Sequence, residues 1–264
     1  MGQVLEEPEI EGFIRDGYLV VRSAFPTELA EECRLSAAQQ LGIDLASPKT
    51  WRRPVVRGVP TGECFKQAAN APRLLEAIAQ LVEPDAWQAR PNLGAFVVRF
   101  PSAEDPGDAG WHIDSSFQPT DESRWFVNYR SKGRALLLLC LVSDVGMDDA
   151  PSRLLPGSHL EMSRLLVPAG DEGLPGAYEG QESKIPLPES KGDEVLATGS
   201  AGDVFICHPF SVHAASWPQR GEQPRFLAQP PITISNGLQL DGPTSRLSPV
   251  ARAIRLGISV EEGS

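Results

Sequence analysis

Residues 202–213 read GDVFICHPFSVH, and the alternation of apolar runs and turn residues in this stretch points to the fold. Residues 204–207 form a short apolar run, a His-Pro pair interrupts it, and a second run covers residues 212–215. Short apolar runs bounded by Gly and Pro predict strands joined by turns. Similar runs occur elsewhere in the chain, at 96–100, 111–115, 134–145 and 226–234. Many short strands with long connections predict a double-sheet jelly roll.

The N-terminal part of the chain has a helical period instead. Apolar side chains recur at helical spacing in residues 7–16, 26–41 and 72–82, and residues 18–21 form a short strand. We therefore expect a single domain over residues 1–264. It would have a helical part at about 1–90, a jelly-roll core at about 91–236 and an insertion at about 160–195. Gly, Pro, Glu and Ser are frequent in the insertion, as in surface loops that act as lids.

The composition argues against several classes of protein. A chain of 264 residues can bury a sizeable core, and its net charge of −11 argues against phosphate-backbone binding, which requires Lys and Arg. The four cysteines lie far apart without a CxxC pair, so neither a zinc knuckle nor a disulfide framework is expected. The start lacks a secretion signal, and the longest apolar run is too short to cross a bilayer. We expect a cytoplasmic monomer or homodimer with no nucleic-acid or membrane partner.

A His-x-Asp tripeptide lies on one of the expected strands. Side chains two residues apart on a strand point the same way, so His112 and Asp114 can face one point in space. One more imidazole, from His208 or His213, would place two nitrogens and one carboxylate on one face of a metal. That arrangement suits non-haem Fe(II), which must also bind a cosubstrate and O2 at open positions. The planar guanidinium group of Arg225 can bind a carboxylate through two hydrogen bonds. Together these parts meet the needs of a 2-oxoglutarate-dependent oxygenase.

Four stretches resemble the phytanoyl-CoA dioxygenase family of Fe(II)/2-oxoglutarate-dependent oxygenases, over roughly residues 13–234. They are DGYLVV at 16–21, WHID at 111–114, APSRLLPGSH at 150–159 and the segment 202–225. The resemblance implies a mainly β protein with flanking helices around a double-stranded β-helix, the cupin-like jelly roll. It also implies that iron is held by His112, Asp114 and His213, and the distal carboxylate of 2-oxoglutarate by Arg225.

The resemblance also helps to choose between the two candidate histidines. His213 lies at the separation from Arg225 that the family uses, which favours it as the third ligand. His208, which precedes a proline, is then expected to stabilise its turn, and His159 of the Pro-Gly-Ser-His sequence is expected to be structural.

The activity implied by the resemblance is hydroxylation of an unactivated C–H bond in a small organic substrate. The cosubstrates would be 2-oxoglutarate and O2, with release of succinate and CO2. Halogenating relatives replace the metal carboxylate by a small residue, whereas this chain keeps Asp114, which favours hydroxylation or a related oxidation. Two alternatives remain. One is a non-catalytic cupin-like protein that binds a metal or small molecule, and the other is a zinc-dependent hydrolase or isomerase in which Arg225 is incidental.

Several further residues are candidates for contact with the cosubstrate or substrate. Arg99 and Thr233 lie on strands near the motif residues and could contact 2-oxoglutarate, although Arg99 could instead form a surface salt bridge and Thr is common in strands. Phe117 and Arg153 could line the substrate pocket. Trp51 and Arg57 are the first and last residues of a basic segment. This segment is either a solvated loop or a rim over the active site that favours an anionic substrate.

Overall fold

A large antiparallel sheet forms one side of the protein. The computed structural model describes residues 3–83, 86–188 and 192–259. Six strands of the sheet follow the order β1-β9-β5-β11-β3-β2, and a seventh, β12, pairs with β5. Their bounds are β1 (Tyr18–Val21), β2 (Val55–Gly58), β3 (Phe96–Arg99), β5 (Leu136–Leu141), β9 (Val204–Cys207), β11 (Arg225–Ala228) and β12 (Pro231–Ile232).

Two smaller sheets complete the β structure. A three-stranded sheet has the order β10-β6-β8, and a two-stranded sheet pairs β4 with β7. Their bounds are β4 (Phe126–Val127), β6 (Arg153–Leu154), β7 (Leu174–Pro175), β8 (Val195–Leu196) and β10 (His213–Ala214). Within the described part of the chain, all strand pairs are antiparallel.

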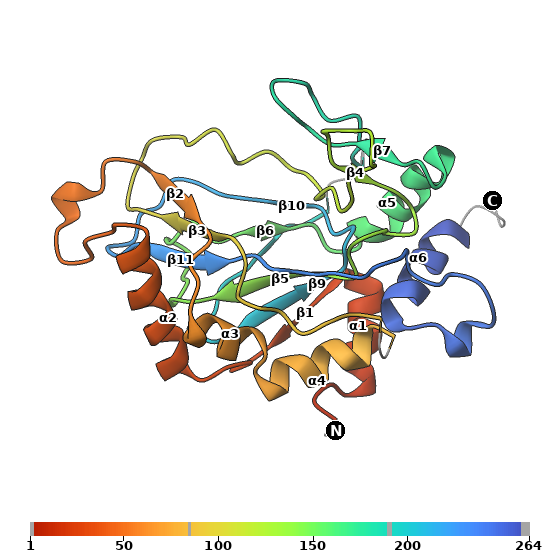
Figure 1. Cartoon of the computed structure of the whole chain (residues 1–264), viewed down its shortest axis with the longest axis horizontal. Helices are drawn as coiled ribbons and strands as arrows, with labels where there is room; N and C mark the ends of the chain where they lie inside the picture. The colour runs from red at the N-terminus through yellow and green to blue at the C-terminus, as the bar shows by residue number, and fades with distance from the viewer. Residues whose placement is uncertain (1–2, 84–85, 189–191, 260–264) are drawn as a thin grey trace.

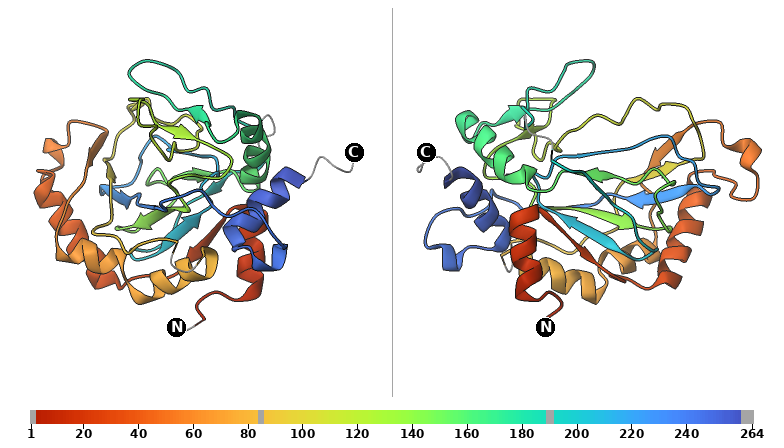
Figure 2. Two further views of the ribbon diagram at one scale, coloured as in Figure 1. Left: turned by 45° about the vertical axis from the view of Figure 1, so that its right-hand side comes forward. Right: turned by 180° about the vertical axis from the view of Figure 1, so that it is seen from behind.

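Helices cover the outer side and one end of the large sheet. Along the outer side lie α2 (Thr27–Gln40), α3 (Glu63–Ala69) and α4 (Pro72–Leu81), as Figures 1 and 2 show. At one end α6 (Pro249–Ser259) packs against α1 (Glu7–Asp16) and α5 (Ser158–Leu166). None of the helices in the described residues is both long and apolar enough to cross a membrane.

Strand β5 is buried on both faces, which explains its unbroken run of leucines. Leu136, Leu138 and Cys140 join the main core, which also contains side chains of the helices. Leu137, Leu139 and Leu141 point the other way, into a second cluster with Leu154 of β6 and Phe205 of β9. Because successive side chains of a strand alternate between its faces, a strand between helices and a second sheet needs apolar residues throughout.

The expected elements differ from the observed ones in several places. The strand expected at 134–145 spans only 136–141, and the one expected at 226–234 is split into β11 and β12. Residues 111–115 are not a strand, because they make a single bridge, from His112 to His213. The expected insertion at about 160–195 contains most of α5, whose buried side chains pack toward α6, as well as β7 and the start of β8.

Glycine 257 allows close packing between α6 and α5, which leads to a stability prediction. A Cβ atom there would overlap the carbonyl oxygen of Leu160, whereas a Cβ on Gly12 in α1 would have no atom closer than 3.9 Å. We expect Gly257→Ala to lower the free energy of unfolding by about 1–3 kcal/mol. Gly12→Ala should raise it by about 0.5–1 kcal/mol, because alanine favours the helix. Urea unfolding of the two variants tests this pair, and equal stability would contradict it.

Candidate metal centre

Three side chains from two separate parts of the chain converge at the edge of the three-stranded sheet. The backbones of His112 and His213 form an antiparallel pair, with N–H···O distances of 3.0 and 2.9 Å. This pairing places the two imidazole rings side by side, 4.4 Å apart between centroids. Asp114, two residues further along, brings its Oδ1 atom to 3.8 Å from Nε2 of His112 and 3.9 Å from Nε2 of His213. The three candidate ligand atoms all lie within 4.8 Å of one another.

The second nitrogen of each imidazole is already engaged by the backbone. Nδ1 of His112 lies 2.9 Å from the carbonyl oxygen of Gly110, and Nδ1 of His213 lies 3.0 Å from that of Ser211. A carbonyl only accepts hydrogen bonds, so Nδ1 carries the proton in the neutral form of each ring, and in that form Nε2 keeps its lone pair. The two Nε2 atoms face the Asp114 carboxylate. Metal-binding histidines use this arrangement, so the donor set fits a divalent metal.

The electrostatics of the three groups also suit metal binding. Burial raises the pKa of Asp114, but the Arg134 guanidinium and the two imidazoles outweigh it, so that pKa lies below its ordinary value. Burial lowers the pKa of His213, and the nearby Asp114 carboxylate only partly opposes this. His112 remains 48% exposed. At neutral pH the carboxylate is therefore ionised and the buried imidazole is neutral, the forms in which both coordinate metals.

Arg134 is a contributor that the sequence alone did not identify. Its Nη1 atom lies 2.5 Å from Oδ2 of Asp114, and its Nη2 donates to the Ser115 carbonyl at 3.1 Å. In the sequence the only signal is a charged residue at the start of the apolar run 134–145. That signal does not indicate which distant carboxylate the residue meets.

A cavity of about 280 Å³ extends from these residues to two buried arginines. Arg225 of β11 and Arg99 of β3 are direct partners in the sheet register, and each is only 2% exposed. Nη1 of Arg225 donates to the Ala150 carbonyl. Among the described residues, neither Nε atom has a hydrogen-bond partner. Burial, and then the neighbouring Arg99, lower the pKa of Arg225 to about 9, so it is still cationic at neutral pH.

One carboxylate compensates part of this positive charge. Asp108 forms an ion pair with Arg99 at 2.6 Å and a second with Arg57. Burial raises the Asp108 pKa, but the two guanidiniums outweigh that effect and hold it below its ordinary value. The ion pair of Arg99 is therefore internal, and the alternative of a surface salt bridge does not describe it. Arg57 lines the outer part of the cavity and is 56% exposed.

The other candidate contact residues lie outside this cavity. Thr233 is exposed. Phe117 is buried, with the Lys132 ammonium 5.0 Å above its ring. Trp51 packs against Phe100. Arg153 lies 4.5 Å above the Trp111 ring and lines a neighbouring cavity.

The two remaining histidines lie together in the core. His208 and His159 are fully buried with ring centroids 4.8 Å apart, and burial lowers the pKa of both. His208 accepts a hydrogen bond from the Phe210 backbone, while His159 bonds the Ile14 carbonyl. In the part of the chain that the structure describes, only His112, Asp114 and His213 group as possible metal ligands.

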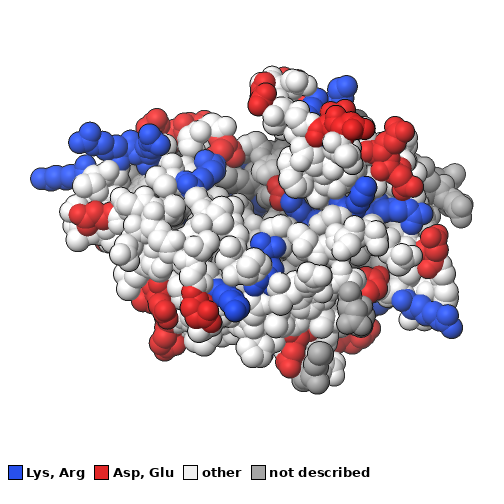
Figure 3. Space-filling view, in the orientation of Figure 1, with Lys and Arg blue, Asp and Glu red and all other residues white. Residues whose placement is uncertain are grey.

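The segment after α5 is held next to β4, the strand that contains Phe126. Strand β7 pairs with β4, and Arg124 donates to the Gly176 carbonyl at 2.5 Å and to Gln181 at 2.9 Å. The segment projects at the upper right of Figure 1, and in Figure 3 the surface beside it is hollowed, with charged side chains inside the hollow.

Comparisons with known proteins identify one family and several structures with a similar fold. The Phytanoyl-CoA dioxygenase (PhyH) family profile matches residues 13–226. A putative oxidoreductase from Salmonella typhimurium LT2 is 15% identical, with a TM-score of 0.59 over 89% of this chain and 71% of that one. HygX from Streptomyces hygroscopicus, solved with nickel, 2-oxoglutarate and hygromycin B, is 17% identical. Its TM-score is 0.53, and the match covers 85% of this chain and 86% of HygX. The non-heme monooxygenase ThoJ is 20% identical. Its TM-score is 0.51, and the match covers 87% of this chain and 80% of ThoJ. No curated protein matches the sequence.

Proposed function

This chain belongs to the phytanoyl-CoA dioxygenase family, and on that premise we propose that it hydroxylates an unactivated C–H bond of a small organic substrate. Family membership makes it an oxidoreductase that uses Fe(II), 2-oxoglutarate and O2. The observation that carries the proposal is the convergence of two imidazoles and one ionised carboxylate next to a buried arginine.

We assign His112, Asp114 and His213 as the residues that would hold the iron. Bound iron, with O2 and 2-oxoglutarate, supplies the oxidising chemistry and yields succinate and CO2. The protein contributes position and charge. Arg225 would bind the distal carboxylate of 2-oxoglutarate, because its Nε lacks a partner among the described residues and its charge is buried at the far end of the cavity. Arg99 would line the same end, with its charge balanced by Asp108.

The identity of the carboxylate residue bears on the type of reaction. Asp114 would take the coordination position that a halide needs in a halogenating enzyme, which supports hydroxylation. Of the residues expected around the substrate, only Arg57 lines the cavity, and it is already paired with Asp108, which it shares with Arg99. The proposal therefore specifies a small organic substrate and does not depend on the charge of that substrate.

The arrangement of the strands supports a proposal for the architecture. The seven-stranded sheet and the sheet β10-β6-β8 enclose an apolar cluster between them. We infer a double-stranded β-helix of the cupin type, which with its flanking helices makes residues 1–264 one domain. The segment at about 167–188 would act as a lid beside the hollow.

Anaerobic titration of the protein with Fe(II) and 2-oxoglutarate tests the proposed function. We expect one equivalent of each to bind, with a weak visible charge-transfer band, and admission of O2 to produce succinate. Stoichiometric iron with no succinate across a broad substrate panel would instead support a non-catalytic binding protein. Turnover that depends on neither 2-oxoglutarate nor O2 would support a zinc hydrolase or isomerase.

A further inference from the structure

The two oxygens of the Asp114 carboxylate face different partners. Oδ1 faces Nε2 of both imidazoles, at 3.8 and 3.9 Å, whereas Oδ2 accepts the 2.5 Å hydrogen bond from Arg134. Arg134 also donates to the carbonyl of Ser115, the next residue in the chain. One guanidinium therefore fixes the carboxylate and the backbone next to it.

The position of Arg134 is itself tightly constrained. Its backbone closes a turn with Ser131, through bonds of 3.2 Å from Arg134 N–H to the Ser131 carbonyl and 2.8 Å from the Ser131 hydroxyl to the Arg134 carbonyl. Gly133 has a φ of 85°, and a Cβ there would overlap the Ser116 carbonyl. The turn therefore packs directly against the segment that follows Asp114. The Arg134 side chain is only 12% exposed, so the guanidinium has little freedom to leave the carboxylate.

This geometry matters because a carboxylate can bind a metal through one oxygen or through both. Chemistry at a two-His-one-carboxylate site needs open coordination positions, and a second carboxylate oxygen on the metal would fill one of them. We propose that Arg134 is a positioning residue, which occupies Oδ2 so that Asp114 binds iron through Oδ1 alone. This inference rests on the proposed function, because it assumes that iron binds at Asp114.

Iron affinity alone is a poor measure of this role. Loss of Arg134 would loosen the carboxylate, which weakens binding, but it would also remove a cation near a divalent ion, which strengthens binding. The open coordination position can be measured directly with nitric oxide, which binds ferrous iron where O2 would and can be titrated without turnover.

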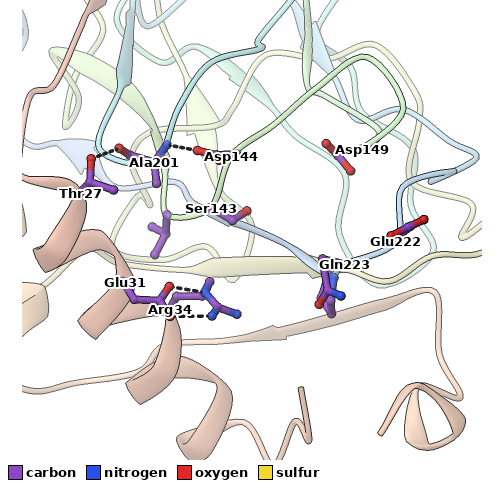
Figure 4. Close-up of a pocket in the computed structure, with 11 residues that line it drawn as sticks. Thr27, Glu31, Arg34, Ser143, Asp144, Asp149, Ala201, Glu222 and Gln223 are labelled. Carbon is purple, nitrogen blue, oxygen red and sulfur yellow. Dashed lines mark hydrogen bonds and ion pairs between the residues drawn. The ribbon is translucent and has the colours of Figure 1, made fainter. Parts of the chain in front are cut away.

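The experiment compares the wild-type protein with Arg134→Met, Arg134→Gln and Arg134→Lys, each loaded anaerobically with Fe(II) and 2-oxoglutarate. Met removes the donors and the charge, and Gln is too short to bridge Asp114 and Ser115. Lys keeps the charge but places its donors on a single nitrogen. The matched control is Arg34→Met. Arg34 is also paired with a carboxylate, at 2.6 Å to Glu31, but it lines a different pocket (Figure 4).

We expect the two neutral variants to bind nitric oxide about 10–100-fold more weakly and to lose kcat for succinate formation by a similar factor. The KM for 2-oxoglutarate should stay within about threefold, since the Arg225 end of the cavity is unchanged. Arg134→Lys should recover most of the nitric oxide affinity, and Arg34→Met should match the wild type. A folded neutral variant, verified by circular dichroism, that binds nitric oxide as tightly as the wild type overturns the inference. If the wild type itself binds no iron and 2-oxoglutarate, the proposed function has failed instead.

Discussion

Replacing Asp114 with alanine should abolish 2-oxoglutarate-dependent succinate formation and lower the affinity for Fe(II) by at least about 100-fold. Asp114 supplies the single carboxylate of the three-residue group, and its pKa is held below the ordinary value, so it contributes a full negative charge at neutral pH. Without it, two imidazoles and the Arg134 cation would surround the ion, with no negative charge from the protein. His213→Ala should have a comparable effect, since it removes the one deeply buried imidazole of the group. Metal content of the purified proteins and the charge-transfer band measure both losses.

His208 provides the control for this prediction. It is buried like His213, but it lies against His159 in the core and bonds the backbone of Phe210. His208→Gln should therefore lower the free energy of unfolding while leaving iron stoichiometry unchanged. If His208→Gln loses the iron and His213→Ala keeps it, the ligand assignment is wrong.

The sequence could indicate parts of the site that depend on local periodicity. His112 and Asp114 are two residues apart, and they reach the same point even though residues 111–115 form only one bridge instead of a strand. Spacing in the sequence does not identify the third candidate ligand, since His208 and His213 are equally plausible on that basis. What separates them in the structure is backbone pairing across about a hundred residues, from His112 to His213.

Contacts between irregular segments were not predictable in the same way. Asp108 lies in a loop and Arg134 at a turn, and neither has a periodic signal that names its partner. In the fold, β5 was expected because burial on both faces requires an unbroken apolar run. Helix α3 is short, and α6 lies in a tail that has only a weak pattern, so neither was expected. Their stability comes from packing on distant elements, which local propensity does not report.

Arg225→Met should raise the dissociation constant for 2-oxoglutarate by about 100-fold, equivalent to ~2.7 kcal/mol, while leaving Fe(II) binding nearly unchanged. The guanidinium is 2% exposed, and its Nε has no partner among the described residues, so a carboxylate in the cavity would meet a desolvated cation with a free donor. Charge-assisted hydrogen bonds are strongest under these conditions. Methionine keeps much of the apolar stem and removes only the charge and the donors. Titration of the iron-loaded variant with 2-oxoglutarate, monitored through the charge-transfer band, gives the constant.

Arg99→Met is the matched comparison, because Arg99 is equally buried and lies opposite Arg225 in the sheet register. Arg99 already forms an ion pair with Asp108, whereas Arg225 donates to the neutral Ala150 carbonyl. Loss of Arg99 also removes a cation that disfavours the charged form of Arg225. We therefore expect Arg99→Met to weaken 2-oxoglutarate binding by less than about tenfold, because the positive charge of Arg225 remains in place. If Arg99→Met weakens 2-oxoglutarate binding more than Arg225→Met does, the assignment of the distal carboxylate to Arg225 is wrong.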